Sequence, residues 1–69
     1  MNVRGLVREL LVAYFNSKRL SYVPIGDFVR DYKAQLPGVD LYRVVYGIGL
    51  NAKGFSIEKD EETTYIRMV

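Results

Sequence analysis

Four carboxylates stand close together near the C-terminus of this chain, and grouped carboxylates are typical of general acid–base or metal-binding sites. They are Glu58, Asp60, Glu61 and Glu62. They are nearly contiguous in a polar stretch, with no apolar segment around them to shift a carboxyl pKa. They also lack the glycine-bearing spacing of a calcium loop. The sequence therefore predicts neither a catalytic pair nor a metal site at this position.

Nucleophilic catalysis lacks its usual partners elsewhere in the chain. There is no His and no Cys, so Ser17, Ser21 and Ser56 have no imidazole to activate them. The same absences remove the thiolate and imidazole ligands that most structural metal sites use. We therefore expect no enzymatic activity, no cofactor, no metal ion and no small-molecule substrate.

Positive charge is concentrated in the first three quarters of the chain, although the net charge is only +2. Residues 1–53 contain eight Lys or Arg and four acids, whereas residues 54–69 contain two Lys or Arg and four acids. A basic body with an acidic end suits a polyanionic partner such as double-stranded DNA. A solvated surface of mixed sign is the alternative explanation of so modest an excess.

Length and composition predict one globular domain over residues 1–69. The hydrophobic fraction of 49% is sufficient for a packed core. The apolar run at residues 10–15 is too short for a membrane span, and the N-terminus lacks the apolar stretch of a signal peptide. We therefore expect a cytoplasmic protein with no membrane association. The missing Cys and the single Gln are typical of a thermophilic source.

Helical spacing of apolar residues predicts three helices, over residues 2–18, 25–35 and 40–52. The first has the longest regular stripe, and Lys18 and Arg19 close it favourably for the helix dipole. Its predicted buried stripe is Val3, Leu6, Val7, Leu10, Leu11 and Tyr14. The Leu36-Pro37-Gly38 segment is expected to stop the second helix.

The third helix begins after Asp40, a good N-cap residue, and is expected to bury one apolar face. That face is Leu41, Val44, Val45 and Ile48. Gly47 and Gly49 conflict with this prediction, because each costs a helix interior about 1 kcal/mol relative to Ala. Either the helix ends early, or another element packs too closely to leave room for a Cβ atom.

Alternation with a period of two predicts strands over residues 55–59 and 64–68. The polar residues between them form the tip of a β-hairpin. A short additional strand is predicted at residues 20–23, where apolar residues alternate ahead of Pro24.

The order helix, strand, helix, helix and hairpin resembles the winged helix-turn-helix family. The segment from Asn51 to Ile57 is the most similar part, since the third helix closes on Gly54 and the apolar Phe55 opens the hairpin. The resemblance covers nearly the whole chain and implies an α+β fold, with three helices packed on a small antiparallel sheet. It also implies that the third helix enters the DNA major groove. Another small α+β fold is the alternative.

The leading functional hypothesis is a small transcriptional regulator that binds duplex DNA through the third helix. A step of 100° per residue turns a set of side chains outward from that helix: Tyr42, Arg43, Tyr46, Gly49, Leu50 and Lys53. Arg43 is the expected base reader, because it is the only cation at the front of this face. The other expected DNA contacts are Tyr42, Tyr46, Lys53, Lys18, Arg19 and Ser21.

A protein-docking subunit of a replication, transcription or translation complex is the alternative hypothesis. The acidic hairpin tip, Asp60 to Glu62, repels phosphates, and Tyr and Arg are enriched at protein interfaces. A homodimer or a heteromeric complex is expected, and the candidate contact residues on the first and third helices are Val12, Phe15, Tyr46 and Leu50.

Overall fold

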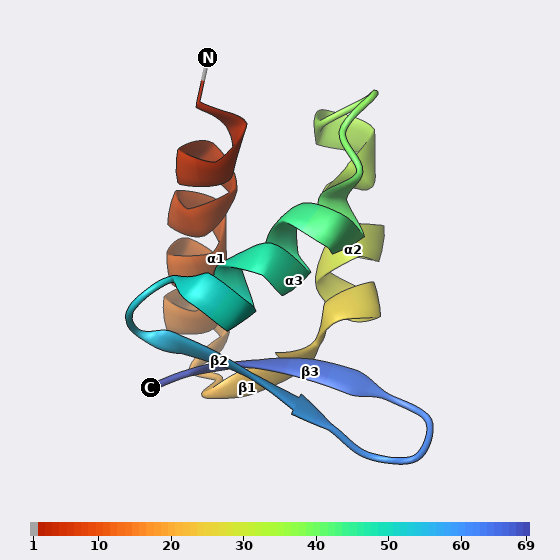
Figure 1. The fold of residues 1–69 in the computed structure, drawn as a ribbon. Helices are drawn as coiled ribbons and strands as arrows, with labels where there is room; N and C mark the ends of the chain where they lie inside the picture. The colour runs from red at the N-terminus through yellow and green to blue at the C-terminus, as the bar shows by residue number, and fades with distance from the viewer. Residues whose placement is uncertain (1) are drawn as a thin grey trace.

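The computed structural model describes residues 2–69 and contains three α-helices, a 3-10 turn and three strands (Figure 1). In chain order they are α1 (Val3–Lys18), β1 (Tyr22–Pro24), α2 (Ile25–Tyr32), the 3-10 turn η1 (Lys33–Gln35), α3 (Leu41–Asn51), β2 (Phe55–Lys59) and β3 (Thr64–Met68). The predicted α+β class is confirmed, and the order of elements is consistent with a winged-helix topology.

Local hydrogen bonds fix both ends of α1. The Asn2 side chain accepts a hydrogen bond from the Gly5 backbone N–H at 2.9 Å, which caps the first turn. At the other end Arg19 has a φ of 54°, and the backbone N–H groups of Arg19 and Leu20 donate to the carbonyls of Asn16 and Phe15. This is a Schellman ending in which an arginine occupies the left-handed position that glycine usually takes.

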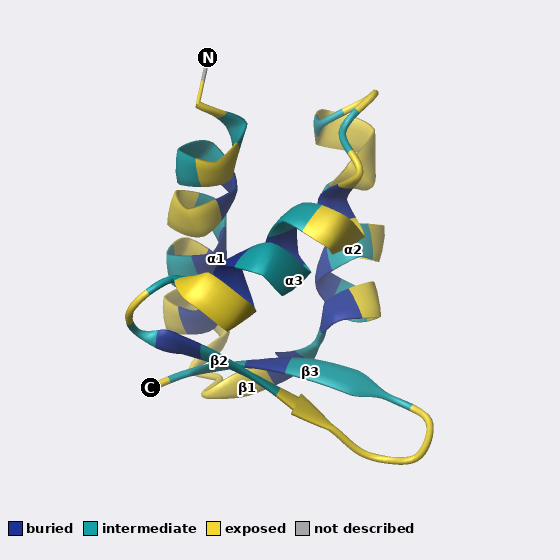
Figure 2. Ribbon diagram, viewed as in Figure 1, coloured by how far each residue is buried: buried dark blue, intermediate teal, exposed yellow. Residues whose placement is uncertain are grey.

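The buried face of α1 differs from the predicted stripe. Its buried side chains are Val7, Leu11, Tyr14 and Phe15, so the expectation that Phe15 offers surface for a partner is wrong. Leu6 is only half-buried, and Val12 packs against the core from its edge. The buried face of α1 includes Phe15 because α1 packs against α3, and the buried parts of α1 face α3 in Figure 2. The helix also contacts α2 through Tyr14.

The second and third helices depart little from their predicted bounds. The predicted helix over 25–35 exists as α2 followed by η1, so its last turn is tightened ahead of Pro37 and Gly38. The predicted N-cap of α3 is confirmed, since the Asp40 carboxylate accepts from the Arg43 backbone N–H at 3.3 Å. Within residues 2–69 no helix is long and apolar enough to cross a bilayer.

The sheet has the order β1-β3-β2, with all pairs antiparallel. The two hairpin strands begin and end as predicted, whereas the first strand is shifted to Tyr22–Pro24. Pro24 is tolerated there because β1 is an edge strand. The three helices cover one face of this sheet (Figure 1). On that face Val23, Ile57 and Ile66 lie beside one another.

The two glycines of α3 have different surroundings, and the helix continues through both. A Cβ atom on Gly49 would overlap the side chain of Ile57 on β2, so close packing is the correct alternative at this position. Gly49 is buried, which makes its predicted outward position wrong. Nothing lies within 4 Å of a Cβ atom built on Gly47, and nothing in the structure explains that glycine.

Candidate nucleic-acid interface

The outward side of α3 combines apolar side chains with one arginine. Tyr42 and Leu50 are 43% and 59% exposed, and Arg43 is exposed between them along the helix. Arg43 makes no ion pair within residues 2–69, because Asp40 binds its backbone rather than its guanidinium. The guanidinium is therefore free to bind an external acceptor such as a guanine edge.

Tyr46 is half-buried and connects α3 to the hairpin formed by β2 and β3, which we call the wing. The Lys59 Nζ atom lies 5.3 Å from the centre of the Tyr46 ring, and the Tyr46 hydroxyl raises the pKa of Lys59. Sequence reasoning missed Lys59. The signal was present, since Lys59 alternates with Phe55 and Ile57 and so shares their face of β2.

Lys53 lies beyond α3 rather than on it. The helix ends at Asn51, and Lys53 is exposed in the turn that leads to β2. The left-handed Gly54, with a φ of 91°, completes that turn. Lys53 and Arg43 therefore mark the two ends of the outward side of α3, with Lys59 on the adjoining strand.

The second predicted group of DNA contacts lies elsewhere, at the corner between α1 and β1. Lys18 and Arg19 are exposed there, and the Lys18 Nζ atom lies 5.2 Å from the centre of the Tyr14 ring. The Ser21 carbonyl accepts a hydrogen bond from the Met68 backbone N–H at 2.9 Å. This corner adjoins β1, the edge strand opposite β2, and α3 packs mainly on β2. The structure therefore places these three residues across β3 from β2, at the same end of the sheet as Lys53.

Two of the four wing carboxylates are engaged within the chain. Glu58 accepts two hydrogen bonds from the Arg67 guanidinium, at 2.8 and 3.0 Å, and this contact lowers the pKa of Glu58. Asp60 accepts from the backbone N–H groups of Glu62 and Thr63, both at 3.0 Å, and these bonds lower the pKa of Asp60. Only Glu58 is paired with a cation within residues 2–69, so the repulsive charge at the tip is carried by Asp60, Glu61 and Glu62.

Charged side chains are paired unevenly across the described chain. Only Arg30 and Arg67, of ten Lys and Arg residues, form ion pairs within residues 2–69. Eight cations are therefore unpaired: Arg4, Arg8, Lys18, Arg19, Lys33, Arg43, Lys53 and Lys59. Five of the eight acids bind an arginine or cap a backbone segment: Asp27, Asp31, Asp40, Glu58 and Asp60. The surface therefore offers more free positive charge than the net charge implies.

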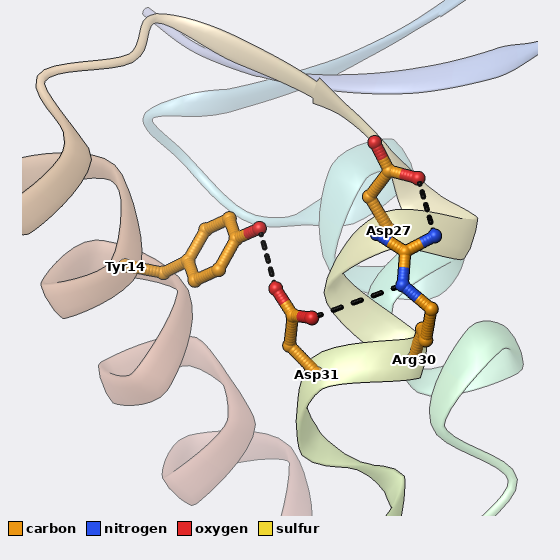
Figure 3. A network of polar contacts seen from close by, with 4 residues as sticks. All are labelled: Tyr14, Asp27, Arg30 and Asp31. Atoms are coloured by element: carbon orange, nitrogen blue, oxygen red, sulfur yellow. Dashed lines mark hydrogen bonds and ion pairs between the residues drawn. The ribbon is translucent and has the colours of Figure 1, made fainter.

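A polar network joins α1 to α2 (Figure 3). The Tyr14 hydroxyl donates to Asp31 at 3.0 Å, and burial, followed by this contact, raises the pKa of Tyr14 to about 12. Arg30 lies 3.3 Å from Asp27 and 3.9 Å from Asp31. The Tyr14–Asp31 hydrogen bond links the two helices.

No cluster of three or more His, Cys, Asp or Glu side chains suited to a metal ion occurs in the part of the chain that the structure describes. Comparison of the chain with family models, with curated proteins and with solved structures finds no match.

Proposed function

We propose that this chain binds duplex DNA through the outward side of α3, as a small transcriptional regulator. The observation that carries the proposal is the unpaired Arg43 on an exposed helix face, with unpaired Lys53 just beyond the other end of that helix and unpaired Lys59 on the adjoining strand. Arginine with a free guanidinium forms two hydrogen bonds to guanine O6 and N7, and lysines at the flanks neutralise phosphates.

The geometry of α3 supports this use. The helix is 11 residues long, about 16 Å at 1.5 Å per residue, which suits a helix lying in the major groove. Arg43 is in its first turn, the end that contacts base edges in helix-turn-helix domains. Because Glu58 binds Arg67, Lys59 is the wing cation placed to approach a phosphate.

The test is a titration of the purified chain with a labelled duplex at about 50 and 200 mM salt. A chain that neutralises several phosphates loses affinity steeply between these concentrations, because bound counterions are released. Weak, salt-insensitive binding at both concentrations would exclude this function.

A protein-docking role is the second candidate, and a specific observation favours it. Leu50 is 59% exposed on the same side of α3 as Arg43, with Tyr46 half-buried beside the wing. Exposed apolar side chains flanked by an arginine suit the centre of a protein interface. If a partner complex is lost with Leu50→Ala while duplex affinity is absent in the parent chain, docking is the function.

A further inference from the structure

One face of the sheet is left uncovered by the helices. Strand register places six residues on it: Tyr22, Pro24, Ser56, Glu58, Tyr65 and Arg67. We call this the outer sheet face. Tyr22 is 49% exposed, and its ring centre lies 5.6 Å from that of Tyr65. Exposed aromatic rings of this kind are more typical of an interface than of a face that meets only water.

The outer sheet face is electrically balanced, unlike the rest of the surface. The Arg67 guanidinium lies 5.0 Å from the centre of the Tyr22 ring and is bound by both carboxylate oxygens of Glu58. The arginine and the glutamate cancel, so two such faces can meet without bringing unpaired like charges together. Elsewhere on the surface the unpaired charges are mainly positive.

The two ends of this face carry opposite charge. Ser21 is held beside Met68 at one end, and Lys18 and Arg19 lie immediately before it. The wing tip, with the exposed Glu61 and Glu62, lies at the other end, where β2 turns into β3. A second molecule turned end for end would therefore meet opposite charge at both ends.

We propose that two copies of this chain pair through their outer sheet faces, with the strands of one copy running opposite to those of the other. The two-fold axis lies in the plane of the faces, perpendicular to the strands, so each copy presents the same patch to the other. Glu61 and Glu62 of each copy then lie opposite Lys18 and Arg19 of the second copy. The exposed Leu20 and Val69 extend the apolar contact at the basic end.

The same axis keeps β2 of both copies on one side of the dimer. Since α3 packs mainly on β2, both α3 helices then lie on that side and can reach a single duplex. The pairing itself does not depend on DNA binding, so it is tested without nucleic acid.

The experiment is sedimentation of the purified full chain across a wide concentration range, with variants that reverse the charge of one end. The expected parent behaviour is a reversible monomer–dimer equilibrium. The double variants Glu61→Lys with Glu62→Lys, and Lys18→Glu with Arg19→Glu, each weaken the dimer about tenfold or more through like-charge contacts. Combining all four substitutions in one chain restores it, because opposite charges face each other again.

Two further variants keep the test specific, and all substituted side chains are exposed. Tyr22→Ser weakens the dimer, whereas Leu50→Ser, an equally exposed apolar change on α3, leaves it unchanged. A parent chain that stays monomeric at millimolar concentration overturns the proposal. So does a charge-swapped chain that fails to recover the dimer, or a dimer that responds to Leu50→Ser and not to Tyr22→Ser.

Discussion

The outward side of α3 and the outer sheet face contain similar side chains in different electrostatic states. Each presents tyrosines and one arginine to solvent, Arg43 on α3 and Arg67 on β3. Arg43 has no carboxylate partner within residues 2–69, whereas Arg67 is bound by Glu58 and packed over Tyr22. Composition alone would assign both surfaces the same use.

The difference shows that availability of a guanidinium, rather than its presence, separates an anion-binding surface from a neutral one. A free arginine retains its full attraction for phosphate or guanine, while an arginine bound by two carboxylate oxygens has two of its five donors occupied and its charge balanced. The α3 side is therefore suited to nucleic acid and the outer sheet face to another neutral surface. Four predictions test this contrast, beginning with the contact that holds α3 on the sheet.

The contact between Gly49 and Ile57 seats α3 on β2, and a single methyl group should disturb it. We expect Gly49→Ala to lower the free energy of unfolding by about 1–3 kcal/mol, since the added Cβ forces Ile57 to move in a packed core. Gly47→Ala is the matched control and should raise it by about 0.5–1 kcal/mol, because nothing crowds that position. Urea denaturation measures both. Equal effects of the two changes would contradict the close approach at Gly49.

Removing each arginine in turn tests the contrast directly. Arg43→Ala should weaken binding to a preferred duplex by about 1–3 kcal/mol and relax the preference at one base pair. Arg67→Ala, an equal loss of charge on the other surface, should leave that preference unchanged. Competition binding with single-base variants of the duplex measures both. The interface is wrongly placed if Arg67→Ala has the larger effect.

Sequence reasoning recovered most of the fold because its signals are local. The Asp40 cap, the period change after Gly54 and the wing strands each depend on a few adjacent residues. Phe15 was missed because the side of α1 that is buried depends on where α3 and α2 pack, which helical spacing alone does not specify.

The candidate site was less predictable, because it depends on contacts between segments. The outward position of Arg43 followed from the helical period, whereas the burial of Gly49 required knowledge of Ile57 on β2. The pairing of Arg67 with Glu58 depends on strand register, and so does the position of Lys59 under Tyr46. The position of Lys18, Arg19 and Ser21 across β3 from β2 required the strand order.

A lysine at the far end of α3 should contribute charge without specificity. We expect Lys53→Ala to weaken binding to all duplexes alike and to flatten the dependence of affinity on salt by about one unit of slope. Arg4→Ala, an exposed and unpaired cation at the start of α1, is the charge-matched control and should change the slope less. Titrations at several salt concentrations compare the two. Equal slopes would mean that net charge, and not position, governs binding.

The smallest expected effect comes from freeing Arg67 without removing it. Glu58→Gln leaves the side-chain shape and releases the guanidinium. Since the pair is exposed, the free energy of unfolding, measured by urea denaturation, should change little at neutral pH. The Arg67 contact lowers the pKa of Glu58, so the pair's contribution to stability is present above the ordinary glutamate pKa and is lost as pH falls through the lowered value. Glu58→Gln should remove that part of the dependence of stability on acid pH.

If α3 alone binds DNA, Glu58→Gln should also keep the parental dependence of DNA affinity on salt, because the released charge lies on the outer sheet face. A steeper slope would show that DNA binds any arginine that lacks a carboxylate partner. The position of Arg43 on α3 would then contribute less to binding than its lack of a partner.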